Sequence, residues 1–283
     1  MIEIKTKSSG AELTSIKKDG IEYMHDGIEF WNRHAPVLFP IVGMLKNNKT
    51  SIAGNIYEMK QHGIARNMEF EEIEKTETKV KYSLKYNEES LKAYPYKFKL
   101  DITYLADNEN SMVTTRYEVH NLEEDKEIIF GLGGHPAFKC DYSSGDYGLR
   151  FEEQNEEENI KILELTEGLI NYNEIDTTSI IRNNCISLKA DTFDKDAIIM
   201  TNIKSNKITL INKKENKEIL EFDFTGFPYL AIWSKKGAPF VCIEPWFNTA
   251  DKVDSNGIFE EKEDIIELKP RKVFKCEYKV KLF

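Results

Sequence analysis

Cysteine is scarce in this sequence, with four among 283 residues at positions 140, 185, 242 and 276 and no C-x-x-C spacing. We therefore expect neither a zinc cage nor a disulfide framework, and we interpret all four as reduced thiols of the core. Runs of apolar residues fall short of the ~18 that a membrane span needs, and the first ten residues lack the apolar segment of a secretory signal. These features predict a cytoplasmic protein that does not bind membranes.

Basic residues are also few, since 39 lysines and arginines face 49 acidic residues and leave a net charge of −10. Such a charge repels nucleic acid on average, so no nucleic-acid partner is expected. A hydrophobic content of 40% is that of a globular protein. We find no linker and no repeat, and we predict one domain over residues 1–283. The acidic run 152–158 is interpreted as a solvated loop.

Alternation of apolar and polar residues dominates the sequence and predicts strands with one wet face. It is clearest in residues 80–86, 98–104, 113–119, 220–224 and 274–282. Helices are expected to be few and short, at residues 88–93 and 190–196, the second capped by Asp191. Strands without helices to cover them bury their apolar faces against other strands, so we predict an all-β fold, a large antiparallel β-sandwich.

Four segments break the alternation and concentrate proline, glycine, histidine and aromatic residues: 35–46, 61–66, 131–138 and 238–246. Loops and strand ends on a rigid β scaffold are common places for binding and catalytic groups. We therefore searched these segments for candidate site residues.

His135 and Glu244 are the strongest candidates. Glycines at 131, 133 and 134 precede His135 and a proline follows it, which indicates a backbone that approaches another segment closely. Glu244 ends an otherwise apolar strand on the same face as Phe240 and Cys242, so its carboxylate is expected to face a pocket. The alternatives are a buried structural histidine and a glutamate satisfied by backbone donors.

His62 and Arg66 share a short segment and can donate hydrogen bonds to a polar ligand, although a surface ion pair explains them equally well. Asp196 begins an apolar strand, where a simple turn residue is the alternative. We interpret His25, His34 and His120 as surface residues. Residues Trp31, Trp233 and Trp246 are expected in the core, though any of them can stack on a sugar.

No nucleophile elbow, phosphate-binding loop, dinucleotide fingerprint or H-E-x-x-H motif occurs. Histidine and glutamate without a nucleophile suggest plain proton transfer, which requires neither a metal nor a cofactor.

At these residues the chain resembles the aldose 1-epimerase (galactose mutarotase-like) family, specifically its bacterial LacX-type branch. The similar segments follow the family's order along nearly the whole chain: LFPIVG (38–43), HGIAR (62–66), YPYKF (94–98), GGHPAF (133–138), DTFDKDAII (191–199), PYLAIWS (228–234) and FVCIEPW (240–246). The resemblance implies a large β-sandwich that binds a sugar on the concave face of one sheet.

The resemblance also implies roles. His135 resembles the general acid and Glu244 the general base of ring opening, while His62, Arg66 and Asp196 resemble substrate-binding residues. For those roles we expect a protonated His135 and an ionised Glu244 at neutral pH.

The family branch often carries an arginine where this chain has Lys46. Lysine offers a point charge in place of a planar fork of donors. The implied function is interconversion of the anomers of a hexose. The alternatives are a hexose-6-phosphate mutarotase, with Arg66 and Lys46 on the phosphate, and a non-catalytic sugar-binding or regulatory protein. We expect a monomer or a homodimer.

Overall fold

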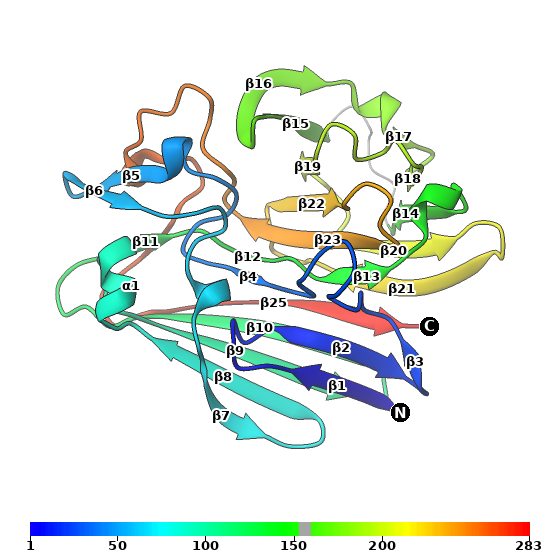
Figure 1. The fold of residues 1–283 in the computed structure, drawn as a ribbon, viewed down its shortest axis with the longest axis horizontal. Helices are drawn as coiled ribbons and strands as arrows, with labels where there is room; N and C mark the ends of the chain where they lie inside the picture. The colour runs from blue at the N-terminus through cyan, green and yellow to red at the C-terminus, as the bar shows by residue number, and fades with distance from the viewer. Residues whose placement is uncertain (153–159) are drawn as a thin grey trace.

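The computed structural model describes residues 1–152 and 160–283. Antiparallel strands in two large sheets are its main elements (Figure 1). The predicted all-β fold is therefore confirmed. Each of the five alternating segments named above lies within or overlaps a strand: β8 (Lys79–Lys85), β9 (Phe98–Asp107), β10 (Met112–Asn121), β21 (Lys217–Asp223) and β25 (Val273–Leu282).

The larger sheet has ten strands and contains these five. Its order is β17-β18-β14-β20-β21-β25-β10-β9-β8-β7, and every neighbouring pair is antiparallel. The remaining members are β7 (Glu71–Lys75), β14 (Tyr147–Phe151), β17 (Ile181–Arg182), β18 (Cys185–Ser187) and β20 (Lys207–Asn212).

The second sheet has eight strands, with the order β16-β15-β19-β22-β23-β12-β4 and with β13 also paired to β23. These strands are β4 (Val37–Leu38), β12 (Leu132–Gly134), β13 (Ala137–Lys139), β15 (Lys161–Thr166), β16 (Leu169–Ile175), β19 (Ile198–Thr201), β22 (Tyr229–Trp233) and β23 (Phe240–Phe247).

Smaller elements surround the two sheets (Figure 1). The strands are β1 (Ile2–Thr6), β2 (Leu13–Lys18), β3 (Ile21–Glu22), β5 (Lys49–Ile52), β6 (Asn55–Glu58), β11 (Ile128–Phe130) and β24 (Ile266–Leu268). The short 3-10 helices are η1 (Lys46–Asn48), η2 (Ala65–Asn67), η3 (Tyr142–Ser144), η5 (Thr177–Ser179) and η6 (Phe259–Glu261).

One of the two predicted helices forms. The helix α1 (Glu88–Ala93) begins at Asn87, whose side chain accepts from the backbone N–H of Ser90, and it ends at Tyr94. The prediction of a helix over 190–196 was wrong, because this segment forms successive turns whose hydrogen bonds span three residues, such as Asp194 N–H to Asp191 O at 3.1 Å.

The main core lies on one face of β23. Val241 and Ile243 of β23 belong to the same buried apolar cluster as Tyr278 and Val280 of the ten-stranded sheet. Phe240 and Cys242, together with Ala137 and Ala238, form a separate cluster. The period-2 prediction for this strand is therefore confirmed, and Glu244 lies on the face opposite the main core.

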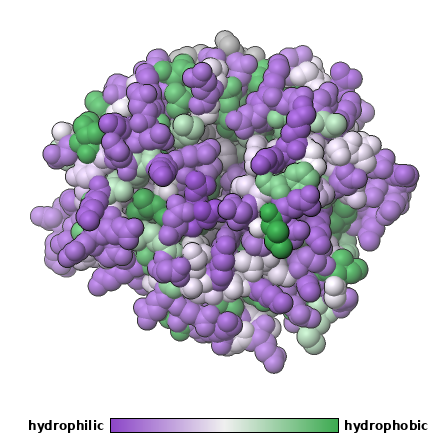
Figure 2. Space-filling view, in the orientation of Figure 1, coloured by the Kyte–Doolittle hydropathy of each residue, from purple (hydrophilic) through white to green (hydrophobic). Residues whose placement is uncertain are grey.

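The surface in Figure 2 is largely hydrophilic, with scattered apolar side chains. Among the described residues, no helix is long and apolar enough to cross a membrane. The four cysteines are free thiols, and Cys140 and Cys242 are buried. The acidic run begins at Glu152 and otherwise lies outside the described residues.

The prediction that three histidines lie at the surface was wrong for His25. Its side chain is buried against the ring of Phe240, with centroids 4.3 Å apart, and its Nε2 lies 2.9 Å from the carbonyl oxygen of Trp31. His34 and His120 are partly buried. Polar neighbours in the sequence hid these positions, because the apolar partners come from distant segments.

Candidate active site

The register of β23 brings His135 opposite Glu244. On one side of His135, Gly133 pairs with Trp246, and on the other side Ala137 pairs with Cys242. Both pairs follow the same register, so the residue between them faces Glu244. Pro136, which has no N–H to donate, separates the two paired strands β12 and β13 at this point.

The glycines before His135 allow a close approach of segments, as predicted. A Cβ atom on Gly133 would lie 2.7 Å from Cδ1 of Trp246, and one on Gly134 would lie 2.8 Å from Cε1 of Tyr278. A side chain at Gly133 would push β12 away from β23, and one at Gly134 would push it away from the ten-stranded sheet. The glycines therefore hold His135 against the strand that carries Glu244.

His135 and Glu244 form a buried pair, with Nε2 and Oε2 3.2 Å apart and side-chain exposures of 8% and 1%. Their geometry is not that of a hydrogen bond, and Oε2 of Glu244 and Nδ1 of His135 have no hydrogen-bond partner among the described residues. Unpaired buried polar atoms are costly, and in native proteins they point to function or to a missing partner.

Burial opposes charge on both members of the pair. It lowers the pKa of His135 to about 3. It also raises the pKa of Glu244 well above its usual value, although the indole of Trp246 opposes this shift. The expectation of a protonated imidazole facing an ionised carboxylate was therefore wrong for the protein alone, because burial favours a neutral imidazole beside a protonated carboxyl group.

His62 reaches the same place from the loop after β6. Its Nδ1 accepts from the backbone N–H of Gly43 at 3.1 Å, so the proton of the neutral ring lies on Nε2. Burial, and then the electrostatic influence of the neighbouring His135 and Arg66, hold the pKa of His62 well below its usual value. The ring centroids of His62 and His135 are 5.6 Å apart. His62 is therefore a neutral donor beside the pair.

Arg66 lies in η2 and donates from Nη2 to the carbonyl oxygen of Gln61 at 2.7 Å. Burial and then the charge of Arg33 lower its pKa to about 10, so it stays cationic. Its buried Nε has no hydrogen-bond partner among the described residues. Asp196 is exposed, with a positive φ of 78°, and its Oδ1 accepts from the N–H of Ala197 at 2.8 Å.

All five predicted site residues line one cavity of about 430 Å³. They come from different parts of the chain: His62, Arg66, His135, Asp196 and Glu244. The residues Trp31, Trp233 and Trp246 line it too, and the ring of Trp31 lies 4.9 Å from that of His135. The expectation of core tryptophans is thus corrected in part, because only Trp246 is buried and all three face the cavity.

Sequence reasoning missed part of the cavity wall. Leu165 and Gly168 of the β15–β16 hairpin line it, as do Gly43 and Gln61. Gln61 was weakly indicated by its place next to His62 in the sequence. Nothing in the sequence indicated the hairpin, because the contact of the hairpin with the cavity depends on tertiary packing.

Lys46 does not lie among the residues that line this cavity. Its Nζ donates to the carbonyl oxygen of Ser255 at 3.2 Å, and its backbone N–H donates to Asp251 Oδ2 at 2.9 Å. The phosphate alternative, with Lys46 and Arg66 on one phosphate, gains no support from this arrangement, because the Lys46 ammonium group is hydrogen-bonded within the protein.

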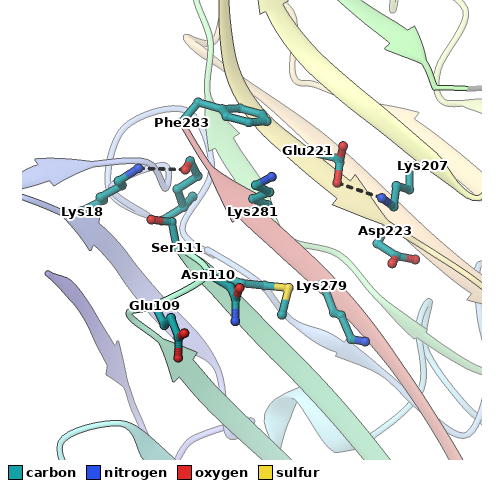
Figure 3. Close-up of a pocket in the computed structure, with 12 residues that line it drawn as sticks. Lys18, Glu109, Asn110, Ser111, Lys207, Glu221, Asp223, Lys279, Lys281 and Phe283 are labelled. Carbon is teal, nitrogen blue, oxygen red and sulfur yellow. Dashed lines mark hydrogen bonds and ion pairs between the residues drawn. The ribbon is translucent and has the colours of Figure 1, made fainter.

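A second, larger hollow of about 860 Å³ lies on the ten-stranded sheet (Figure 3). Lysines and acidic residues line it together, and Lys207 Nζ lies 3.2 Å from Glu221 Oε1. None of the five predicted site residues lines it.

Comparisons with known proteins show the family of the chain. The sequence model of the aldose 1-epimerase family matches residues 2–257. The chain is 34% identical to the chromosomal LacX protein of Lactococcus lactis, over 99% of this chain and 96% of that protein.

Solved structures give the same result. A galactose mutarotase related enzyme from Lactobacillus acidophilus is 32% identical with a TM-score of 0.90, over 100% of this chain and 95% of that one. A galactose mutarotase-like protein from Lactobacillus casei is 30% identical with a TM-score of 0.91, over 100% and 97% of the two chains. With its fold, its cavity and these similarities, the chain belongs to the aldose 1-epimerase family.

Proposed function

We propose that this cavity interconverts the α and β anomers of a free aldose, with His135 and Glu244 as the acid–base pair and without a cofactor. The observation that carries the proposal is the buried contact of 3.2 Å between these side chains in the wall of a cavity of about 430 Å³. Two proton-transfer groups side by side can serve the anomeric hydroxyl and the ring oxygen of one sugar.

The pair carries the one proton that the reaction needs. Moving it from the Glu244 carboxyl to the imidazole of His135 produces a carboxylate beside an imidazolium. Glu244 then takes the proton of the anomeric hydroxyl while His135 protonates the ring oxygen, and the C1–O5 bond breaks to give the open aldehyde. Rotation about C1–C2 and closure by the reverse steps yield the other anomer and restore the pair.

The other cavity residues hold the sugar. His62 donates from Nε2, since its Nδ1 is occupied by Gly43. Within residues 1–152 and 160–283, Gln61 is the one acceptor of the Arg66 guanidinium group, so its other donors are available to hydroxyl groups. Asp196 accepts from a hydroxyl at the rim, and the tryptophans offer apolar faces to the sugar ring.

The charges of the cavity favour a free sugar over a phosphorylated one. Arg66 is the one lysine or arginine among the described residues that line it, and the acidic Asp196 and Glu244 line it as well. A phosphate would meet one guanidinium group and two acids, with the Lys46 ammonium held by Ser255.

Anomer exchange measured by NMR on free and 6-phosphorylated aldoses tests the proposal. We expect the protein to accelerate exchange of a free aldose, the His135→Gln variant to lose this acceleration, and His120→Gln, which changes a histidine of β10, to keep it. Acceleration of phosphosugars alone would select the phosphate alternative. Sugar binding without acceleration would select the non-catalytic one.

A further inference from the structure

A thiol lies next to the acid–base pair. Cys242 is two residues before Glu244 on the same face of β23, and it is fully buried. Three potential ligand atoms, one from each of His135, Cys242 and Glu244, all lie within 4.8 Å of one another. We propose that these three residues bind one Zn²⁺ ion, which inhibits the enzyme by occupying the acid–base pair. The inhibition rests on the proposed function, whereas the binding does not.

The donor set suits zinc. Imidazole nitrogen, thiolate sulfur and carboxylate oxygen are the three protein ligands that Zn²⁺ prefers, and three such ligands leave a fourth position open. Here that position faces the cavity, because His135 and Glu244 both line it. Mg²⁺ and Ca²⁺ prefer oxygen ligands and are not expected to compete.

The geometry is close to that of a zinc site. Ligands of one tetrahedral zinc lie roughly 3.5 Å apart, as follows from bond lengths of about 2.0–2.3 Å. His135 Nε2 and Glu244 Oε2 already lie 3.2 Å apart. A contraction of the widest separation in the cluster by about 1 Å completes the set, and rotation about side-chain bonds supplies such a shift.

Buried atoms without partners point to a cation at this place. Oε2 of Glu244 is buried and has no hydrogen-bond partner among the described residues. The Glu244 side chain is 1% exposed, so bulk solvent hardly reaches this carboxyl group. A bound cation would stabilise an ionised carboxylate that burial alone disfavours.

No zinc motif is visible in the sequence because the ligands come from two strands. Cys242 and Glu244 are separated by a single residue, whereas His135 is brought to them by the pairing of β13 and β12 with β23. The site is therefore a property of the strand register.

Cobalt absorption provides the test on the whole protein. Co²⁺ replaces Zn²⁺ in such sites, and a thiolate ligand gives a charge-transfer band in the near ultraviolet. We expect one Co²⁺ per chain with this band, displacement by one equivalent of Zn²⁺, and no band in Cys242→Ala. The matched control is Cys140→Ala, which removes another buried free thiol and should keep the band.

Activity gives the second readout. Zn²⁺ should inhibit anomer exchange in the unsubstituted protein and in Cys140→Ala, with an inhibition constant at least about tenfold higher in Cys242→Ala. A missing band in the unsubstituted protein, or a band retained in Cys242→Ala, would overturn the proposal. If Cys242→Ala misfolds, the presence or absence of the band in the unsubstituted protein still tests the zinc site. This readout does not depend on whether the protein turns over a sugar.

Discussion

The two hollows of this protein differ in what their polar groups contact. In the larger one, of about 860 Å³ on the ten-stranded sheet, Lys207 lies 3.2 Å from Glu221 (Figure 3). Lys279, which also lines it, lies 3.2 Å from Glu277. The smaller one, of about 430 Å³ on the eight-stranded sheet, holds Glu244 and His135, whose buried atoms Oε2 and Nδ1 find no hydrogen-bond partner in the part of the chain that the structure describes. The proposal of the smaller cavity as the site therefore rests on its unpaired buried polar atoms and not on its size.

Solvent explains the difference. Charges in the larger hollow stay partly hydrated, with Lys207 32% and Glu221 20% exposed, so their ion pair adds little to stability. In the smaller cavity, burial shifts the pKa of both Glu244 and His135 toward their neutral forms. A sugar that brings hydroxyl groups to these atoms supplies the missing partners.

The largest expected effect is a difference in rate between two variants, each of which lacks one carboxylate in one of the two hollows. Glu244→Gln should slow anomer exchange by about 10²–10⁴-fold, because it removes a proton-transfer group. Glu221→Gln in the larger hollow should leave the rate unchanged. NMR exchange measurements on both variants, with circular dichroism to show folding, check this. Near-normal turnover of folded Glu244→Gln would remove this residue from the mechanism and end the distinction between the two hollows.

A second comparison concerns the ion pair behind the cavity wall. Lys262 Nζ donates to Asp251 Oδ1 at 2.7 Å, with side-chain exposures of 8% and 2%. The backbone of Asp251 also joins two wall segments, by donating to Met44 O at 2.8 Å and accepting from Ile170 N–H at 2.9 Å. Asp251 therefore ties together the loop of Gly43 and the β15–β16 hairpin.

Lys262→Met should lower the free energy of unfolding by about 3 kcal/mol or more, because it leaves the Asp251 carboxylate buried without its cation. Lys207→Met, which breaks the partly exposed pair in the larger hollow, should cost about 1 kcal/mol or less. Urea denaturation of both variants measures the two costs. Equal losses would show that the two regions do not differ in the way their burial indicates.

The sequence predicted the strands well, because alternation is a local pattern. Residues 98–104 and 274–282 lie within strands, and the face of Glu244 followed from counting by two along β23. The helix over 190–196 was a wrong prediction, since several turns give the same composition as a short helix. Local patterns thus specify the elements but not the order of strands in each sheet.

The candidate site was predicted from unusual residues and from the resemblance to a family. His135 and Glu244 were chosen from the glycines, the proline and the charge at a strand end, and the cavity brings them together. The protonation of the pair was predicted wrongly, because the depth of burial depends on all surrounding segments. Lys46 was misplaced for the same reason, since its partner Ser255 is 209 positions away.

The smallest expected effect is a difference in the pH dependence of stability. Above the ordinary pKa of glutamate, the unfolded chain loses the Glu244 proton while the native state keeps it, because burial raises the native pKa. The free energy of unfolding of the unsubstituted protein therefore falls as the pH rises, by about 1 kcal/mol per pH unit until the native pKa of Glu244 is reached. Glu244→Gln lacks this loss, so its free energy of unfolding should gain on that of the unsubstituted protein as the pH rises above the ordinary pKa of glutamate. His135, whose native pKa is lowered to about 3, makes the same contribution to the pH dependence of both proteins, so it cancels from this comparison. Parallel stability curves from urea denaturation would show that the carboxyl group is already ionised, and the contrast between the two hollows would then rest on hydrogen bonding alone.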